Sequence, residues 1–501
     1  MKNYKYIAAL LISVGFASCD VNNELDVIEG ATMPEVALNK NDIDFSKYIA
    51  VGASFTAGFT DNGLFIAGQE NSFPNILAEK FGTEFKQPLM NDNFGGLIVA
   101  GSSVISPVTN ERLFSERLVF GGAGPVPLKN LNPSAMSTTD FALNNPTGPF
   151  NNLGVPGAKS FHLIAPGYGS LANFPAAANP YAVRMTGTSP NKSILELAEE
   201  QNPTFFTLSE VGGNDVLGYA TSGGDGSDVI TDIATFDFAL NTLVNGLTAN
   251  GAKGAIGNLP DITSLSYFTT VTYNAVPLGE PNVTALNTGY AAYNEGIKQG
   301  FAFLVANTPM TQEMADAEIA KRTINFSVGQ NAIVIMDENL TDLTAINPSL
   351  ISMRQATPED LILLPASSLL PTGVGSQTPL GDTYVLLPEE QMEIKNATTA
   401  YNASISAIAS AKGLALVDLN AVLIEASTTG ISFDNQPMDT SLVFGGLVSL
   451  DGVHLTGRGY ALMANSFLKA IDNTYGSNFT TATNGLAKAQ DYPTNYSPTL
   501  Q

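Results

Sequence analysis

Cysteine, histidine and tryptophan are scarce in this chain of 501 residues, which has one cysteine, two histidines and no tryptophan. A single cysteine excludes an intramolecular disulfide, so the fold must be stabilised by its core alone. Two histidines and one cysteine argue against a zinc site built from His and Cys ligands. The absence of tryptophan removes the side chain that stacks best on sugar rings, although 16 tyrosines and 27 phenylalanines remain.

Basic side chains are also few. The chain has 22 lysines and arginines against 46 aspartates and glutamates, which gives a formal net charge of −24. Such a surface repels the phosphates of nucleic acids and the headgroups of anionic lipids. We therefore expect no nucleic-acid partner, and attachment to a membrane would need a lipid anchor. No cofactor or metal is expected.

The N-terminal residues have the layout of a secretory signal, because two lysines precede an apolar run over residues 7–16 that is too short to span a bilayer. The residues at positions 16–19, Phe-Ala-Ser-Cys, resemble the lipobox of bacterial lipoproteins. The resemblance implies a signal peptide over residues 1–18 and lipidation of Cys19. The protein would then lie in the cell envelope as an outer-membrane lipoprotein facing the periplasm or the cell surface. A plain secretory signal with an incidental cysteine is the alternative.

Short apolar runs alternate with helical patterns along the chain. The pattern predicts strands and helices in alternation, with strands over 48–51, 204–208, 254–259 and 414–418 and helices over 71–81, 236–247, 285–305 and 389–412. Repeated strand, helix and strand units favour an α/β fold, a doubly wound parallel sheet with helices on both faces.

Two long stretches, 61–150 and 262–388, interrupt this alternation with Gly, Pro and Asn clusters between apolar runs. Their apolar content is too high for disorder, so we interpret them as insertions of the kind that form lids or pocket walls. A separately folded domain inside the second insertion is the alternative. The main domain would cover 47–475 after a tether over 19–46. Residues 476–501 lack periodicity and are expected to form a loosely held tail.

Three loops carry candidate catalytic groups. Ser54 directly follows the strand at 48–51, and ligands of parallel sheets bind beyond the carboxyl ends of strands. Asn214, in the sequence Gly-Gly-Asn-Asp, offers a neutral amide donor to a developing oxyanion. Gly157 offers a backbone N–H from a third loop. Taken alone, each also fits a structural role, such as a serine at a strand end or an asparagine that caps a turn.

A fourth segment contains Asp451 and His454, three residues apart around a glycine. The turn can bring the Asp451 carboxylate to the Nδ1–H of His454 and leave Nε2 free to take a proton. A solvated surface turn is the alternative. The other histidine, His162, has no acid beside it and lies between two apolar residues, so we expect a structural or pocket-rim role for it.

Together and in this order, the four segments resemble the SGNH or GDSL family of serine esterases and lipases over about residues 48–475. The resemblance implies Ser54 as nucleophile, Asp451 and His454 as the acid and base, and the Ser54 N–H with Gly157 and Asn214 as the oxyanion donors. Further similar residues are Gly251-Ala252-Lys253, Asn258-Leu259-Pro260-Asp261, Tyr401-Asn402 and Gly459-Tyr460.

The sequence departs from the family pattern at three positions. Ala53 and Phe55 stand where the family has Asp and Leu around the serine, and Leu455 stands where it has Pro after the histidine. None of these changes removes a group that transfers a proton. Because of Phe55 and the two insertions, the substrate preference of smaller family members is not transferred to this chain.

The resemblance implies an exported, lipid-anchored serine hydrolase that cleaves carboxylic esters by double displacement, without a cofactor. The leading interpretation is an esterase or lipase acting on lipids or small acyl esters. One alternative is a carbohydrate esterase that removes acyl groups from a glycan. The other is a non-catalytic surface lipoprotein that binds a ligand with a degenerate hydrolase fold. The expected partners are an ester substrate and, through the anchor, a membrane.

Overall fold

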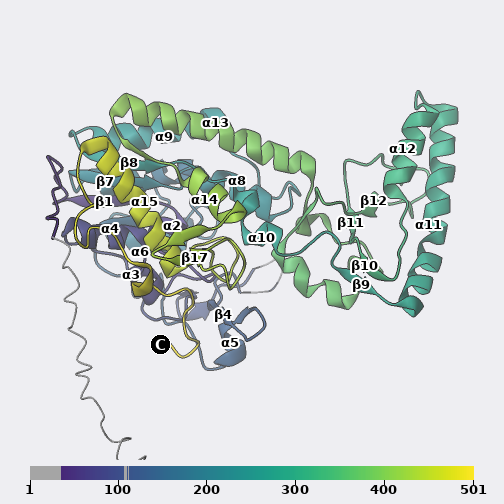
Figure 1. The fold of residues 1–501 in the computed structure, drawn as a ribbon, viewed down its shortest axis with the longest axis horizontal. Coiled ribbons are helices and arrows are strands. Elements are labelled where there is room, and N and C mark those ends of the chain that lie inside the picture. Colours follow the sequence, from purple (N-terminus) through teal and green to yellow (C-terminus); the bar gives the residue numbers. More distant parts are fainter. Residues whose placement is uncertain (1–34, 107–109, 111, 501) are drawn as a thin grey trace, which may run out of the picture. The chain divides into compact units, whose positions relative to one another are not determined.

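The computed structural model describes residues 35–106, 110 and 112–500 (Figure 1). The signal peptide predicted over 1–18 and the lipidation predicted at Cys19 lie outside these residues. The chain from Leu38 onwards forms one compact unit. Within the described ranges, no helix combines the length and the apolar character needed to cross a membrane.

A sheet of five parallel strands forms the centre of this unit, in the order β15, β8, β7, β1, β6. Its strands are β1 (Tyr48–Gly52), β6 (Asn152–Gly154), β7 (Phe205–Ser209), β8 (Lys253–Gly257) and β15 (Ala415–Val417). Every residue of β1 and β7 is buried, as expected for strands covered on both faces. The parallel α/β sheet predicted from the alternating pattern is confirmed.

Helices flank the sheet (Figure 1). One group contains α7 (Ile194–Glu199), α9 (Ile233–Thr248) and α13 (Pro388–Lys412), and α9 packs against both of the others. The other contains α4 (Phe73–Phe81) and α15 (Gly457–Tyr475).

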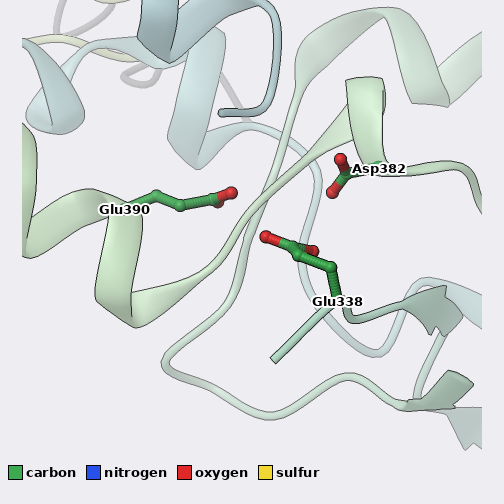
Figure 2. Close-up of side chains that lie close together, drawn as sticks. All are labelled: Glu338, Asp382 and Glu390. Carbon is green, nitrogen blue, oxygen red and sulfur yellow. The ribbon is translucent and has the colours of Figure 1, made fainter. Parts of the chain in front are cut away.

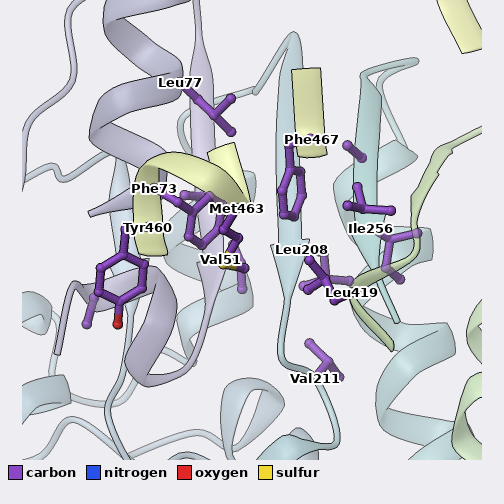
Figure 3. Close-up of a cluster of buried hydrophobic side chains, with 14 of the residues drawn as sticks. Val51, Phe73, Leu77, Leu208, Val211, Ile256, Leu419, Tyr460, Met463 and Phe467 are labelled. Atoms are coloured by element: carbon purple, nitrogen blue, oxygen red, sulfur yellow. The ribbon is translucent and has the colours of Figure 1, made fainter. Parts of the chain in front are cut away.

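The core between the sheet and the second group of helices is built from large apolar side chains. Phe73 of α4 stacks on Phe467 of α15 with ring centroids 4.9 Å apart. Figure 3 shows these rings beside Val51, Leu208 and Ile256, which come from three adjacent strands. Burial of such side chains is the main stabilising term available to a fold without disulfides.

The predicted helices and strands agree with the structure to within a few residues at their ends. The helix predicted over 236–247 is α9, that over 389–412 is α13, and the strand predicted over 204–208 is β7. The strand β6 and the helix α15 were not predicted. β6 has only three residues, Asn-Leu-Gly, so it offers no apolar run.

The remaining elements are mostly short. The helices are α2 (Ser54–Ala57), α3 (Ile66–Glu70), α5 (Leu128–Leu131), α6 (Pro180–Thr186), α8 (Gly213–Thr221), α10 (Ser266–Thr269), α11 (Glu280–Asn307), α12 (Gln312–Arg322) and α14 (Leu419–Thr428). The 3₁₀ helices are η1 (Ser160–Ile164), η2 (Leu171–Asn173), η3 (Ile262–Ser264), η4 (Leu364–Ser368), η5 (Leu370–Thr372), η6 (Asp382–Tyr384) and η7 (Ala489–Asp491).

Small antiparallel pairs of strands lie outside the central sheet. They are β2 (Ile98–Val99) with β3 (Ser102–Ser103), β4 (Leu118–Phe120) with β5 (Pro125–Pro127), β9 (Val276–Leu278) with β10 (Gly329–Asn331), β11 (Val334–Met336) with β12 (Met353–Gln355), β13 (Leu361–Ile362) with β14 (Val385–Leu386), and β16 (Ile431–Phe433) with β17 (Gln436–Met438).

The stretch 262–388 has hydrophobic clusters of its own. One gathers around Ile297 and Phe301 of α11, and another around Ile335 of β11 and Ile362 of β13. In the same stretch Arg354 is buried and forms ion pairs with Asp337 and Asp360. These clusters give the stretch a defined structure within the same compact unit as the sheet.

The C-terminal segment after α15 packs against the rest of the unit. Phe479, Ala487 and Ala489 belong to the main hydrophobic cluster, and a guanidinium nitrogen of Arg117 donates to the carbonyl oxygen of Ser497 over 2.7 Å. The prediction of a loosely held tail over 476–501 is therefore wrong for the residues described. A few well-spaced apolar side chains and backbone carbonyls hold the segment, and such contacts leave no periodic pattern in the sequence.

Candidate active site

Ser54 lies at the point where the order of the sheet reverses. Its strand, β1, lies between β6, the next strand of the sheet along the chain, and β7, the one after that, and ligands of open α/β sheets bind at such a point. The strand ends at Gly52, where a Cβ would lie 2.5 Å from the carbonyl oxygen of Ser209. Only glycine fits this close approach. Ser54 then begins the one-turn helix α2 and is 8% exposed.

Glu210 fixes the turn that presents Ser54. It follows β7 with a φ of 57°, which is unusual for a residue with a side chain. Its carboxylate accepts hydrogen bonds from the backbone N–H of Phe55 at 2.8 Å and of Thr56 at 2.9 Å, and from the Thr56 hydroxyl at 2.9 Å. Burial raises the pKa of Glu210 to about 7, although these hydrogen bonds act to lower it. Glu210 was not predicted from the sequence, where its position two residues before Gly-Gly-Asn-Asp is the only local signal that marks it.

Asn214 lies in the first turn of α8 and faces the loop after β6. Its Nδ2 donates to the carbonyl oxygen of Ala158 over 2.9 Å, which leaves one N–H of the amide for another acceptor. The turn before it needs glycine, because Gly212 has a φ of 104° and a Cβ there would lie 2.7 Å from the ring of Phe236.

The loop after β6 is fixed from two sides. Asn179 donates to the carbonyl oxygen of Pro156 over 2.8 Å, and Asp215 of α8 accepts from the backbone N–H and the hydroxyl of Ser160, both at 2.7 Å. Between these anchors Gly157 is exposed and has a φ of 78°. The structure therefore brings the loop of Gly157 and the side chain of Asn214 together.

Asp451 and His454 form a hydrogen-bonded pair. Nδ1 of His454 lies 2.9 Å from Oδ2 of Asp451, and the two side chains are 15% and 10% exposed. The same carboxylate accepts from the backbone N–H groups of Val453, His454 and Asn62 at 2.8 to 2.9 Å. Burial opposes the ionisation of Asp451, but the charge and hydrogen bonds of His454 hold the pKa of Asp451 well below its usual range. An ionised Asp451 fixes the proton of His454 on Nδ1 and leaves Nε2 as the basic atom.

The imidazole lies against the residues that follow Ser54. The ring centroid of His454 is 4.6 Å from that of Phe59 and 5.7 Å from that of Phe55. Phe59 donates its backbone N–H to the carbonyl oxygen of Ser54 over 2.9 Å. Among the hydrogen bonds of the described residues there is none between Ser54 and His454. In hydrolases without substrate this contact is often long and tightens when the substrate binds.

The segment before His454 is held by hydrogen bonds to residues that follow α2. The backbone N–H of Asp61 donates to Oγ of Ser449 over 3.1 Å, and Oδ1 of Asp61 accepts from the backbone N–H of Leu450 at 3.1 Å. Burial raises the pKa of Asp61 to about 7. The Tyr460 hydroxyl donates to the carbonyl oxygen of Phe59 over 2.6 Å. Like Glu210, Asp61 was missed, because nothing local in the sequence indicates a contact with residues so far along the chain.

A cavity of about 100 Å³ opens beside Ser54. Ser54 and Asn214 line it, as do Val453 and Leu455 on either side of His454. The rest of the lining is almost wholly apolar and includes Leu259, Ile262, Leu265, Leu419, Leu423 and Met463. An apolar cavity with a few polar groups at one end is the usual form of a site for a small organic ligand.

His162 occupies a different environment. Its Nδ1 accepts the backbone N–H of Lys159 over 3.1 Å, and its ring stacks on Tyr168 with centroids 4.6 Å apart. Burial lowers the pKa of His162. In a catalytic base, Nδ1 would face a carboxylate that orients the ring. In His162, Nδ1 faces a backbone N–H instead.

Comparison of the chain with protein-family models, with curated proteins and with solved structures finds no match.

Proposed function

We propose that this protein is a serine hydrolase of the SGNH or GDSL type that cleaves carboxylic esters. One observation carries the proposal: the hydrogen bond of 2.9 Å between Asp451 and Nδ1 of His454, in a segment whose flanking residues line the same cavity as Ser54 and Asn214. A nucleophile, an oriented base and an amide donor around one cavity are the components of acyl transfer.

In the proposed reaction, Nε2 of His454 takes the hydroxyl proton of Ser54 as Oγ attacks the ester carbonyl carbon. Asp451 stays ionised and stabilises the imidazolium that forms. The imidazolium then gives its proton to the leaving alkoxide, which departs as an alcohol. Water attacks the acyl-enzyme with His454 again as base, and the acid is released as Ser54 regains its proton.

Three donors are proposed to stabilise the oxyanion: the backbone N–H groups of Ser54 and Gly157 and the side-chain amide of Asn214. Glu210 engages the N–H groups of the two residues after Ser54, which leaves the Ser54 N–H for the substrate. The Asn214 amide is held by Ala158 beside the Gly157 loop. Loss of one such donor costs about 3 kcal/mol of transition-state stabilisation in other hydrolases.

The lining of the cavity favours an esterase or lipase acting on apolar acyl groups over a carbohydrate esterase. Leucine, isoleucine and methionine side chains suit an acyl chain, whereas a sugar needs polar partners and aromatic faces. A glycan deacylase and a non-catalytic binding protein remain the competing functions.

Hydrolysis of chromogenic esters from acetyl to long acyl chains tests the proposal. Wild type should be active with a preference for chains longer than acetyl, and Ser54→Ala should lose activity while its melting temperature is retained. Ser432→Ala is the matched control, because Ser432 is exposed on β16. Equal rates in wild type and Ser54→Ala would refute the catalytic role. Activity confined to acetyl groups, with acetate released from acetylated glycan, would favour the deacylase.

We also propose that the protein is anchored in the cell envelope through a lipid on Cys19. Cys19→Ser removes the thiol that would accept the lipid, so the protein should move from the membrane fraction to the soluble exported fraction. Unchanged partitioning of the variant would show that another feature holds the protein at the membrane.

A further inference from the structure

Three carboxylates from separate segments converge outside the candidate active site (Figure 2). Glu338 follows β11, Asp382 begins η6 and Glu390 lies in the first turn of α13. One oxygen of each carboxylate lies within 4.8 Å of one oxygen of the other two. Figure 2 shows the three side chains pointing into a shared space.

Two of these carboxylates have oxygens that are buried without a partner. Glu390 is only 4% exposed, and its Oε1 has no hydrogen bond, whereas its Oε2 accepts from the backbone N–H of Leu387 over 2.6 Å. Oδ1 of Asp382 is also buried without a partner. The salt bridges among the described residues include none of the three acids. Burying unpaired carboxylate oxygens side by side is costly unless a positive charge or a proton lies between them.

The surrounding backbone is shaped to leave this space open. Gly224 has a φ of 71°, and a Cβ there would lie 2.2 Å from Oε1 of Glu390. At Gly223, a Cβ would lie 2.2 Å from the carbonyl oxygen of Asp382. A side chain at either position would therefore intrude on Glu390 or on the backbone of Asp382.

The electrostatics of the cluster agree with the geometry. Burial and the Glu338 carboxylate raise the pKa of Asp382 to about 7, and burial and Glu338 raise the pKa of Glu390 to about 8. Arg354, whose partner Asp337 precedes Glu338, is already paired with Asp337 and Asp360. Among the described residues no lysine or arginine pairs with the three acids, so either protons or a bound cation must lie between their oxygens.

We propose that Glu338, Asp382 and Glu390 form a binding site for a divalent cation, and that the cation is calcium. Carboxylate oxygens are the preferred ligands of hard cations. Three carboxylates from three segments offer up to six oxygens in flexible geometry, which suits calcium, whereas magnesium keeps several waters and binds through one or two carboxylates. Glu338 is exposed, so a cation can enter and keep water on that side.

The bound cation connects parts of the chain that are distant in sequence. Glu338 and Asp382 belong to the stretch 262–388, and Glu390 belongs to α13, which packs against α8 and α9 beside the sheet. Calcium that binds only the folded state would stabilise the protein by an amount that grows with the logarithm of the calcium concentration once this exceeds the Kd.

The test uses the full-length purified chain, stripped with EDTA and dialysed. Isothermal titration with CaCl₂ should give one calcium per chain, and 1 mM CaCl₂ should raise the melting temperature by about 2 °C or more. Glu390→Gln should bind calcium at least about tenfold more weakly, because it removes the buried charge. The Gln carbonyl oxygen can still accept from Leu387, so the variant should fold.

Glu389→Gln is the matched control, because Glu389 is the exposed neighbour in the same helix and the change in charge is the same. It should bind calcium like wild type. The proposal is overturned if wild type shows neither binding heat nor a shift in melting temperature, or if Glu390→Gln and Glu389→Gln respond to calcium alike. Tighter binding of MgCl₂ than of CaCl₂ would overturn the assignment to calcium.

Discussion

At the scale of single residues, the proposed chemistry depends on how the side chains of Asp451 and Glu210 are held. Asp451 accepts four hydrogen bonds, one from the imidazole of His454 and three from backbone N–H groups. Glu210 accepts three at the start of α2, beside Ser54. In the proposed mechanism Asp451 orients the base His454 and Glu210 positions the nucleophile Ser54, so their substitution should have different kinetic consequences.

Replacement of the proposed catalytic residues should give a graded loss of activity. Ser54→Ala and His454→Ala should each lower kcat by about 10⁶, whereas Asp451→Asn should lower it by about 10⁴, because the imidazole remains but its orientation is lost. Single-turnover kinetics with a chromogenic ester measure the three variants. If Asp451→Asn were as inactive as Ser54→Ala, Asp451 would have a larger role than orienting His454.

Glu210 should behave as a positioning residue. Glu210→Ala frees the N–H groups of Phe55 and Thr56, so Ser54 shifts and kcat should fall by about 10 to 100-fold. Glu210→Gln keeps one acceptor oxygen and should be intermediate. Separate kcat and KM values for both variants check this, with Glu79→Ala, exposed on α4, as control. A rise in KM at constant kcat would indicate that Glu210 contacts the substrate instead.

Much of the candidate site could be predicted from the sequence at this scale. Ser54 and Asn214 follow apolar runs, and Asp451 and His454 are three residues apart, so local patterns mark them. Glu210 and Asp61 could not be predicted, because they act through contacts with segments far away in the chain. The same holds for the three carboxylates of the proposed calcium site, which no local motif connects.

At the scale of elements, the helix α15 begins three residues after His454. The helix begins at Gly457, and the Thr456 side chain caps it by accepting from the backbone N–H of Gly459 over 2.9 Å. The Thr456 hydroxyl also donates to the carbonyl oxygen of Gly446 over 2.7 Å. The helix was not predicted, because the glycines at its start obscure its apolar face, which includes the buried residues Tyr460 and Phe467.

Removal of this cap should destabilise the protein. Thr456→Ala leaves the N–H of Gly459 and the carbonyl of Gly446 without partners, and we expect a loss of about 1 to 2 kcal/mol in the free energy of unfolding. Thr456→Ser keeps both hydrogen bonds and should recover most of this stability. Urea denaturation of the three proteins measures the effect, and equal midpoints for Thr456→Ala and wild type would show that the cap is unimportant.

The predicted parallel sheet follows from elementary physical chemistry at this scale. Runs such as Tyr48–Val51 are buried on both faces of the sheet and so are apolar throughout, which makes them visible in the sequence. The short strand β6 and the packed C-terminal segment depend on tertiary contacts and lack such a signal.

At the scale of the whole molecule, the many buried carboxyl groups make stability depend on pH. Burial raises the pKa of Asp61 and of Glu210 to about 7, above the values of the unfolded chain. Between about pH 5 and 7 the folded protein therefore holds protons that the unfolded chain has released. The stability that these protons contribute is present at low pH and is lost as the pH rises through 7.

Asp61→Asn should weaken this dependence. The amide cannot ionise, and its oxygen can still accept from Leu450, so the variant should lose less stability than wild type between pH 5 and pH 8. Melting temperatures across this range give the comparison. Asp451 acts in the opposite direction, since its lowered pKa contributes stability that is lost only as the pH falls below about 4. Parallel pH profiles for wild type and Asp61→Asn would contradict the assignment of the raised pKa to Asp61.

The proposed serine hydrolase is tested most directly by covalent labelling with an alkyl fluorophosphonate. The reagent reacts with activated serines, so intact-mass and peptide analysis should find one adduct per chain, located on Ser54. The adduct should be absent from Ser54→Ala and should form far more slowly in His454→Ala. Failure of the folded wild type to react, or an adduct that forms equally in Ser54→Ala, would contradict the proposed function.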